Sequence, residues 1–266
     1  MVAEGSSYLL PDSDTASVPR CTTCSSTNWS RTISIAAGNT AWSTSISRGG
    51  GFEGYIGSES LAASRENLVA IGTMFHISSD GLQWTPVSTT TNNPGPVLAV
   101  EGTCDVFAGA YGGIGLNPIV YSSDDCGESW DGAGVRDVLP GAASVHGVAV
   151  DTRPGHFVVY AYHTQGLIRS EDHGRTWIQL TLPAATEYWT YGLEVDDRDG
   201  SLWLVARNEF EADGRLFRSQ DGGMSWNVEH TEIPDGERPL SAEWDSKRSA
   251  LYIDTETTVY TFLPDE

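Results

Sequence analysis

The chain has 266 residues, of which 36 are Asp or Glu and 15 are Lys or Arg, so its formal net charge is −21. Such a charge disfavours binding to nucleic acid and insertion into anionic membranes, because the long-range field repels phosphate groups. No apolar run approaches the roughly 18 residues of a membrane span. Glycine is frequent and the apolar residues occur in short runs, which favours an all-β chain of short strands joined by tight turns.

The first 21 residues are predicted to be an N-terminal extension of a single domain that covers residues 22–266. The extension begins MVAEGSS, without a charged segment followed by an apolar one, so no export signal is expected in this stretch. Cys21 and Cys24 form a lone CxxC, which suits either a small disulfide loop or half of a metal site. Because no second CxxC and no paired histidines accompany it, neither a metal nor a cofactor is predicted.

An octet then recurs along the chain. The pattern S-x-D-x-G-x-[ST]-W occurs at residues 123–130, 170–177 and 219–226; residues 78–84 form a copy one residue shorter, and residues 22–29 an eroded copy. Successive octet tryptophans are 55, 46, 47 and 49 residues apart, an interval typical of a four-stranded propeller blade. In a hairpin turn the Asp accepts backbone N–H bonds, the Gly supplies a positive φ, and the Trp packs between blades.

This octet resembles the Asp box, or BNR repeat, of sialidases, sortilin-type receptors, xyloglucanases and photosystem assembly factors. The resemblance covers roughly residues 22–263. It implies a β-propeller in which each box lies on the turn between the third and fourth strands, away from the functional face. Asp125, Asp172 and Asp221 are therefore predicted to be structural residues.

Cysteines 104 and 126 lie about equally far from the glycine-rich stretch 112–115. A hairpin folded there would place the two side chains opposite each other, so a Cys104–Cys126 disulfide is predicted. A disulfide implies an oxidising compartment, which favours a secreted, periplasmic or cell-surface protein.

Strand patterns between the octets predict four strands per blade. The final segment offers three strands and no octet, and residues 29–35 offer a strand without a partner. Pairing this strand with the last blade would close the ring and remove two exposed edges. The prediction is a β-propeller of five four-stranded blades, or of six if residues 6–20 or 49–60 contain further strands.

A functional site is expected on the face opposite the octets or in the central funnel. Aromatic rings there would stack on sugars while charged and amide groups bond hydroxyls, so the predicted partner is a carbohydrate or a surface protein. His146 and His163 are expected to approach each other, but two histidines alone are more typical of a polar surface. The candidate binding residues are Trp42, Tyr111, His146, Tyr162, His163, Tyr188, Trp189, Arg207, Glu209 and Arg238, with Glu187, Asn208 and Glu237 beside them.

The alternative function is a glycoside hydrolase. The stretch 201–208 before the third complete octet resembles the sialidase segment whose Arg binds the substrate carboxylate. The resemblance implies that Arg207 is this Arg, that Glu194 activates a nucleophile, and that Tyr252 is that nucleophile. The start of the sialidase pattern, a third Arg and an acid Asp are absent. The carboxylates considered for another hydrolase are Glu187, Glu194, Glu209 and Glu237.

Overall fold

A computed structural model describes residues 16–17, 32–37, 40–45, 61–71, 74–80, 83–90, 94–110, 119–135, 137–139, 145–163, 166–183, 188–208, 213–233 and 237–264. All regular elements in these ranges are β-strands. The described residues contain no helix of the length and apolar character needed to span a bilayer. The all-β prediction is confirmed.

The strands form six antiparallel sheets within the described residues. The first comprises β1 (Ala16–Ser17), β2 (Thr32–Ala37) and β3 (Thr40–Ser45). The second comprises β4 (Leu61–Ala63), β5 (Leu68–Ile71), β6 (Met74–Ser78) and β7 (Thr85–Thr90). The third comprises β8 (Pro94–Ala99), β9 (Val106–Ala110), β10 (Ile119–Ser123) and β11 (Asp131–Gly134).

The remaining three sheets follow in chain order. The fourth comprises β12 (Gly147–Asp151), β13 (Val158–His163), β14 (Gly166–Ser170) and β15 (Ile178–Leu180). The fifth comprises β16 (Tyr188–Val195), β17 (Leu202–Asn208), β18 (Asp213–Ser219) and β19 (Asn227–Ile233). The last comprises β20 (Pro239–Asp245), β21 (Ala250–Thr255) and β22 (Val259–Phe262).

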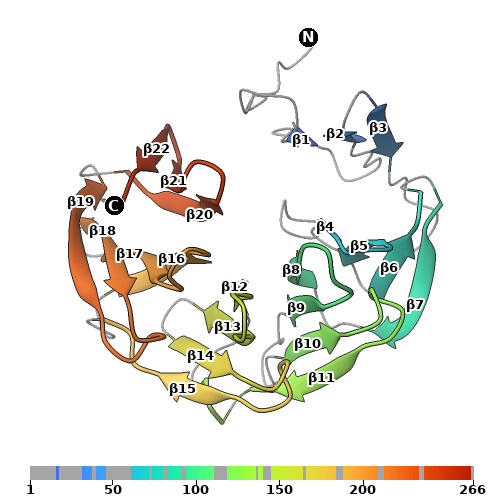
Figure 1. Cartoon of the computed structure of the whole chain (residues 1–266), viewed down its shortest axis with the longest axis horizontal. Helices are drawn as coiled ribbons and strands as arrows, with labels where there is room; N and C mark the ends of the chain where they lie inside the picture. The colour runs from blue at the N-terminus through green and yellow to red at the C-terminus, as the bar shows by residue number, and fades with distance from the viewer. Residues whose placement is uncertain are drawn as a thin grey trace.

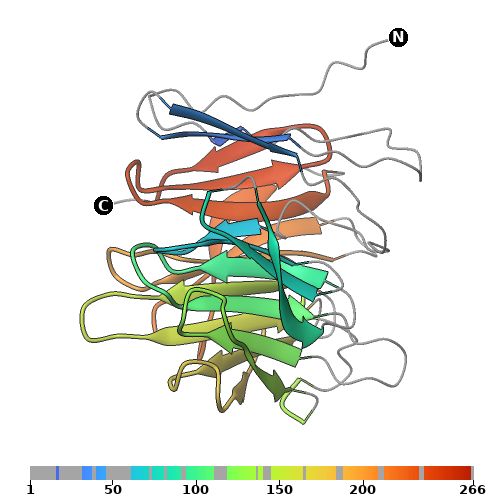
Figure 2. The same ribbon diagram turned by 90° about the vertical axis from the view of Figure 1, so that its right-hand side faces the viewer.

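The sheets stand like blades around a common centre (Figure 1), as in a β-propeller. The inner strands β4, β8, β12, β16 and β20 contact one another in series. Figure 2 shows the blades edge-on. Each inner strand therefore brings its two ends to the two faces of the ring, where a ligand has access.

The core lies in the gaps between consecutive sheets. Successive side chains of β17 point to opposite sides, because side chains alternate along a strand. Leu202 and Leu204 pack against the sheet of β12–β15, whereas Trp203 and Val205 pack against Leu251 and its neighbours in the last sheet. Both sides are buried, which is why the strand reads as a continuous apolar run rather than an alternating one.

The octets occupy the predicted turns. Residues 78–84, 123–130, 170–177 and 219–226 each connect the third strand of a sheet to the fourth. The ring of Trp130 stacks on Phe75 of the preceding sheet, with centroids 3.8 Å apart and planes 7° apart. Trp177 and Trp226 also pack into the apolar clusters shared with the preceding sheets. The predicted packing of the tryptophans between blades is confirmed.

The predicted pairing of strand 29–35 with the last sheet is wrong for the described residues. The strand observed there, β2, pairs with β3 along one edge and with β1 at Ser34 and Ile35 on the other, and no described residue of β2 pairs with β22. Only two residues separate β2 from β3 along the chain, and the entropic cost of closing so short a connection is small. β1 lies within the predicted N-terminal extension and joins this local sheet.

Candidate functional site on the face opposite the octet turns

The ring has two chemically distinct faces. We call the end of the sheets that carries the octet turns and the first-to-second strand turns the octet face. The other end, where β13 and β17 finish and where β16 and β20 begin, is the opposite face. The sequence predicts the site on the opposite face, and the polar contacts of the two faces differ.

The carboxylate of Asp172 accepts hydrogen bonds from other residues of its own octet turn. Its Oδ1 accepts hydrogen bonds from Ser170 Oγ at 2.8 Å and from the backbone N of Thr176 at 2.8 Å, and its Oδ2 accepts one from Thr176 Oγ1 at 2.6 Å. The backbone N of Gly174, at φ +80°, donates to Ser170 Oγ at 2.9 Å. The roles predicted for the Asp and the Gly are confirmed.

The same bonds recur at the Asp125 and Asp221 turns. Hydrogen bonds from the Thr176 side chain and backbone hold the pKa of Asp172 at about 2. Bonds from the Ser225 side chain and backbone do the same for Asp221, also to about 2. Carboxylates bound in this way serve the turn and are poorly suited to proton transfer near neutral pH.

A second repeated turn on the octet face was not identified from the sequence. Arg153 bonds the carboxylate of Asp151 from both Nε and Nη2, at 2.9 and 2.7 Å, and Arg198 bonds Asp196 in the same way at 3.0 and 2.7 Å. Asp151 and Asp196 are buried. The signal was present as Asp-x-Arg at the end of both inner strands.

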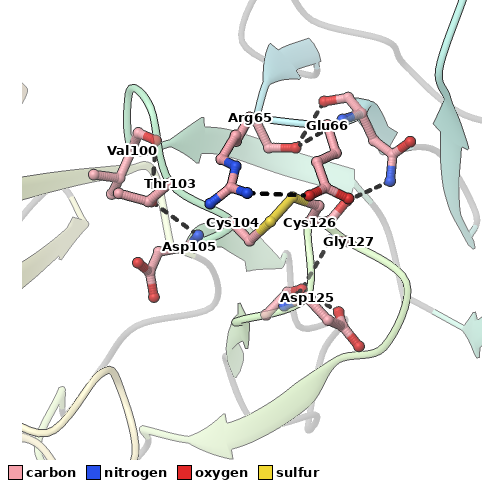
Figure 3. Close-up of a disulfide and its surroundings, with 12 residues drawn as sticks. Arg65, Glu66, Val100, Thr103, Cys104, Asp105, Asp125, Cys126 and Gly127 are labelled. Carbon is pink, nitrogen blue, oxygen red and sulfur yellow. Dashed lines mark hydrogen bonds and ion pairs between the residues drawn. A yellow bond between two sulfur atoms is a disulfide. The ribbon is translucent and has the colours of Figure 1, made fainter.

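The predicted Cys104–Cys126 disulfide is present. Figure 3 shows it joining the β8–β9 turn to the octet turn, where the backbone N of Cys126 also donates to the carbonyl of Cys104 at 3.0 Å. Glu66 lies close enough to form a ligand-like group with the two sulfurs. Because the sulfurs are bonded to each other, they offer no thiolate to a metal. Cys21 and Cys24 lie outside the described residues.

The octet face also has a pocket between the sheets of β8–β11 and β12–β15. It encloses about 330 Å³ of empty space, part of it open to solvent, and its lining includes Asp105, Asp124, Asp131, His173 and Arg175. His173 Nδ1 lies 3.4 Å from Asp105 Oδ1, and its ring stacks on Phe157 at 3.9 Å. None of the predicted binding residues that the structure describes lines this pocket.

On the opposite face, His146 and His163 meet at one end of β12 and β13. Their ring centroids are 6.5 Å apart at an interplanar angle of 85°, so the predicted approach is confirmed. Burial and then the neighbouring His146 lower the pKa of His163 to about 4, and burial lowers the pKa of His146. Both imidazoles are therefore neutral at pH 7.

Tyrosine and arginine side chains link three consecutive sheets on this face. Tyr162 Oη donates to the carbonyl of Tyr191 at 3.4 Å, and Arg238 donates from Nε and Nη2 to Tyr191 Oη at 3.2 and 3.1 Å. Tyr162 belongs to β13, Tyr191 to β16, and Arg238 directly precedes β20. The sequence singled out Tyr162 and Arg238 but missed Tyr191, which lies at the bulge of β16 between Thr190 and Gly192.

Trp189 and Arg207 lie beside this link. They are paired residues of β16 and β17, so their side chains share the side that faces the last sheet. Trp189 is 36% exposed, and Arg207 is half-buried. Asn208 follows Arg207 and is buried. The structure thus brings Trp189, Arg207 and Arg238 to the same end of one gap, between the sheets of β16–β19 and β20–β22.

Glu237 is held by the last sheet. Its carboxylate accepts hydrogen bonds from Thr257 Oγ1 at 2.5 Å and Thr255 Oγ1 at 2.9 Å, and these bonds lower its pKa. A carboxylate occupied by two hydroxyls is a poor candidate for a general acid. Glu237 directly precedes Arg238 in the chain, but these two bonds of its carboxylate are made to the last sheet.

The three residues implied by the sialidase resemblance are not brought together. Glu194 pairs with Trp203 and Arg207 with Trp189, which separates Glu194 from Arg207 by about 13 Å along the strands. Tyr252 lies between Leu251 and Ile253, whose side chains pack towards β17, so Tyr252 points to the other side of its sheet.

The carboxylate placed beside Tyr252 is instead Glu243, its partner in the register of β20 and β21. Burial and then the charge of Asp245 raise the pKa of Glu243, although Glu243 is exposed by its surface area. Sequence reasoning missed this pair because the contact depends on strand register. The alternation of Glu243 with Trp244 in the predicted strand was the available signal.

Several predicted site residues lie beyond what the structure describes. Tyr111, Glu187 and Glu209 are outside the described residues. Trp42 lies in β3 and Tyr188 begins β16, but the structure describes only their backbone. For these five residues the predictions stay predictions.

Comparison with known proteins places the fold. No family model and no curated protein matches the sequence. Solved structures do: the GH74 xyloglucanase from Xanthomonas campestris has a TM-score of 0.62 at 15% identity, over 92% of this chain and 42% of its own. YCF48 bound to D1 peptide has a TM-score of 0.55 at 11% identity, and the match covers 98% of this chain and 82% of YCF48. An extracellular domain from B. thetaiotaomicron has a TM-score of 0.57 at 16% identity, and the match covers 94% of this chain and 32% of that one.

At these identities the likeness shows a propeller-type fold alone. The chain spans less than half the length of the xyloglucanase and of the B. thetaiotaomicron chain. The likeness supports the predicted β-propeller and leaves the ligand to be inferred from the side chains of this chain.

Proposed function

We propose that this chain is a binding module that recognises a glycan through the face opposite the octet turns. The observation that carries the proposal is the exposed ring of Trp189 beside Arg207 and the Tyr191–Arg238 link, at the mouth of one gap. An aromatic face with neighbouring donors suits a sugar ring and its hydroxyls. The Asp carboxylates at the third octet position, by contrast, are used within their turns.

Three further observations support this proposal. The octets resemble the Asp box, whose families use the other face for function. Among the similar structures, the xyloglucanase acts on a carbohydrate and the B. thetaiotaomicron domain is extracellular. The Cys104–Cys126 disulfide fits an oxidising compartment, so we propose a secreted, periplasmic or cell-surface location.

A glycan array tests the proposal. Wild-type protein should bind a defined subset of glycans, and Trp189→Leu should weaken that binding by at least about tenfold, because a central aromatic anchor carries much of a binding energy. Met224→Ser is the matched control, since Met224 is exposed on an octet turn. Failure to bind any glycan, or equal loss in the control, would contradict the proposal.

The second candidate is a glycoside hydrolase, favoured by one observation. Glu243 and Tyr252 are register partners, and a carboxylate with a raised pKa beside a phenol suits proton transfer at the hydroxyl. A panel of fluorogenic glycosides separates the candidates: turnover that Glu243→Gln abolishes and Glu194→Gln spares would establish the hydrolase. We expect no turnover, and near-normal glycan affinity in Glu194→Gln.

A further inference from the structure

The pocket on the octet face has a lining that suits a positively charged group. Its empty space of about 330 Å³, between the sheets of β8–β11 and β12–β15, is at the lower end of the range for ligand sites. Three carboxylates line it, from Asp105, Asp124 and Asp131, against one guanidinium, from Arg175. The buried ring of Phe107 also belongs to the lining, and an aromatic ring is a favourable neighbour for a cation.

Two of these carboxylates differ from the Asp at the third octet position. Asp124 and Asp131 are exposed, and within the part of the chain that the structure describes their carboxylates have no hydrogen bond or ion pair. Asp125, by contrast, is bonded by Ser123 and Ser129 of its own turn. A ligand can therefore bond Asp124 and Asp131 without breaking the octet turn.

The walls of the pocket are held in place before any ligand arrives. Asp105 directly follows Cys104, and Figure 3 shows it beside the disulfide that joins its turn to the octet turn of Cys126. From the other wall, His173 Nδ1 lies 3.4 Å from Asp105 Oδ1, and Phe157 stacks on the His173 ring at 3.9 Å. Groups that are already ordered lose less entropy on binding.

The spacing of the carboxylates favours an organic cation over a metal ion. Among the described residues, the one group of three metal-ligand side chains with donor atoms within 4.8 Å of one another is Glu66, Cys104 and Cys126. The acids of the pocket do not converge in this way, as the oxygen ligands of a metal ion must. An ammonium or guanidinium group carries several N–H donors and can bond separate carboxylates.

The next gap of the same face has apolar side chains at the equivalent positions. When the octets are aligned, Asp131 corresponds to Ile178 and Arg175 corresponds to Met224. Ile178 is 56% exposed and Met224 is 64% exposed. An acidic hollow beside exposed apolar side chains fits the surface of a partner protein better than a free amine, which would leave the apolar side chains uncovered.

We propose that the octet face docks a partner protein, with a lysine or arginine side chain of the partner in the acidic pocket and an apolar side chain against Ile178 and Met224. The net charge of −21 attracts a basic partner from a distance. This surface is separate from the proposed glycan site and does not depend on it.

The test uses an array of end-blocked Gly–Ser peptides, each with one lysine and one leucine at a different spacing. The same peptides with Nε-acetyl-lysine, or with serine in place of leucine, are the matched controls. Wild-type protein should bind at least one spacing, and acetylation should weaken that binding at least about tenfold, because it removes the charge that the carboxylates bind. Spermidine should bind more weakly than this peptide by a similar factor, because it covers no apolar side chain.

Variants of the pocket test which residues bind the lysine. Asp124→Asn combined with Asp131→Asn should remove the preference for lysine over acetyl-lysine. The control is Glu101→Gln combined with Glu128→Gln, which removes two charges from exposed positions outside the pocket lining and should keep the preference. Arg175→Gln should strengthen lysine binding about threefold, because it removes a repelling charge from the pocket.

A second pair of changes tests the apolar contact. Ile178→Ser combined with Met224→Ser should remove the preference for leucine over serine and keep the preference for lysine. Binding at no spacing, a lysine preference that survives Asp124→Asn with Asp131→Asn, or equal affinity for spermidine would overturn the proposal. None of these outcomes bears on glycan binding at the opposite face, so the two proposals succeed or fail separately.

Discussion

The octet face and the opposite face hold their polar groups in different ways. On the octet face the repeated turn carboxylates are bonded within their own turns: Asp172 is bonded by Ser170 and Thr176 from the same octet, and Asp196 by Arg198 two residues later. Other bonds on this face join neighbouring sheets, as from Trp244 Nε1 to Asp197 Oδ1 at 2.9 Å. On the opposite face the bonds cross between sheets, as from Arg238 to Tyr191. Local bonds form wherever the motif occurs, whereas bonds between sheets exist only once the ring has assembled.

This difference explains why one face repeats and the other does not. The octet turns have nearly identical hydrogen bonds in three sheets, and only their variable positions, such as Asp124 and Arg175, distinguish one turn from the next. The mouths of the gaps on the opposite face differ, with two histidines in one and a tryptophan and two arginines in another. A single glycan site is therefore expected on the irregular face, whereas the docking surface proposed on the octet face depends on the variable positions. The following predictions test this division, beginning with the largest expected effect.

Removal of the disulfide should have the largest effect on stability. The bond closes a loop with a sequence separation of 22 on the octet face. A double Cys104→Ser, Cys126→Ser variant should lose about 3 kcal/mol of unfolding free energy, since the cross-link restricts the unfolded chain. Urea denaturation of the variant and of the oxidised wild type measures the loss. Equal stability would show that the neighbouring turn contacts alone hold this end of the sheet.

Truncation of an octet Asp should cost somewhat less. Asp172→Ala removes the acceptor of several hydrogen bonds and should lower the unfolding free energy by about 2 kcal/mol. Glu171→Ala is the matched control, because Glu171 is exposed and forms a surface ion pair with Arg169. The control should change stability by less than about 0.5 kcal/mol. Similar losses in both variants would contradict the structural role of the octet Asp.

The two faces should lose stability in different pH windows. The pKa of His163 is lowered from 6.5 to about 4 in the folded state, so the unfolded state takes up a proton first as the pH falls. Its contribution is complete above pH 6.5 and is lost between 6.5 and 4. The pKa of Asp172 is lowered from 3.8 to about 2, so its contribution is complete above pH 3.8 and is lost between 3.8 and 2.

Thermal melts across this range should separate the windows. His163→Gln should flatten the decline of Tm between pH 6.5 and 4, and Asp172→Asn the decline below 4. His156→Gln, in an exposed turn of the octet face, is the control for the histidine. An unchanged slope in His163→Gln would mean that burial of this imidazole does not govern the acid response of the opposite face.

The smallest effect on stability should come from the proposed site itself. Trp189→Leu keeps an apolar contact in the gap, so the unfolding free energy should change by less than about 1 kcal/mol. Urea denaturation beside the glycan array gives both quantities for one variant. If Trp189→Leu loses more unfolding free energy than Asp172→Ala, Trp189 is needed mainly for the stability of the fold. The two faces would then not differ in the way proposed here.

Much of the architecture was predictable from the chain. The octets repeat at blade-length intervals, and their Ser, Asp, Gly and Trp act through contacts of short range, so the turn position, the positive φ at Gly174 and the packing of Trp130 followed from the pattern. The Cys104–Cys126 bond was equally predictable, because both cysteines flank one hairpin. The pairing of strand 29–35 was not predictable in this way, because several strands compete for the same sheet edge and the sequence does not show which one pairs there.

The site was only partly predictable for the same reason. The contact of His146 with His163 lies within one sheet and was expected, whereas the Tyr191–Arg238 bond joins two sheets and was missed. The pairing of Glu243 with Tyr252, rather than Glu194 with Tyr252, was decided by strand register. A shift of one residue would exchange the side of the sheet to which every side chain points.

The sequence by itself determined the all-β class, the blade repeat, the chemistry of the octet turns and the disulfide, because each depends on residues close together in the chain or repeated at fixed spacing. Only the tertiary structure decided which side chains meet in the gaps between sheets, how β2 is paired, and where Arg207, Trp189 and Arg238 gather. Those contacts join residues dozens of positions apart, and their geometry exists only after the sheets have packed against one another.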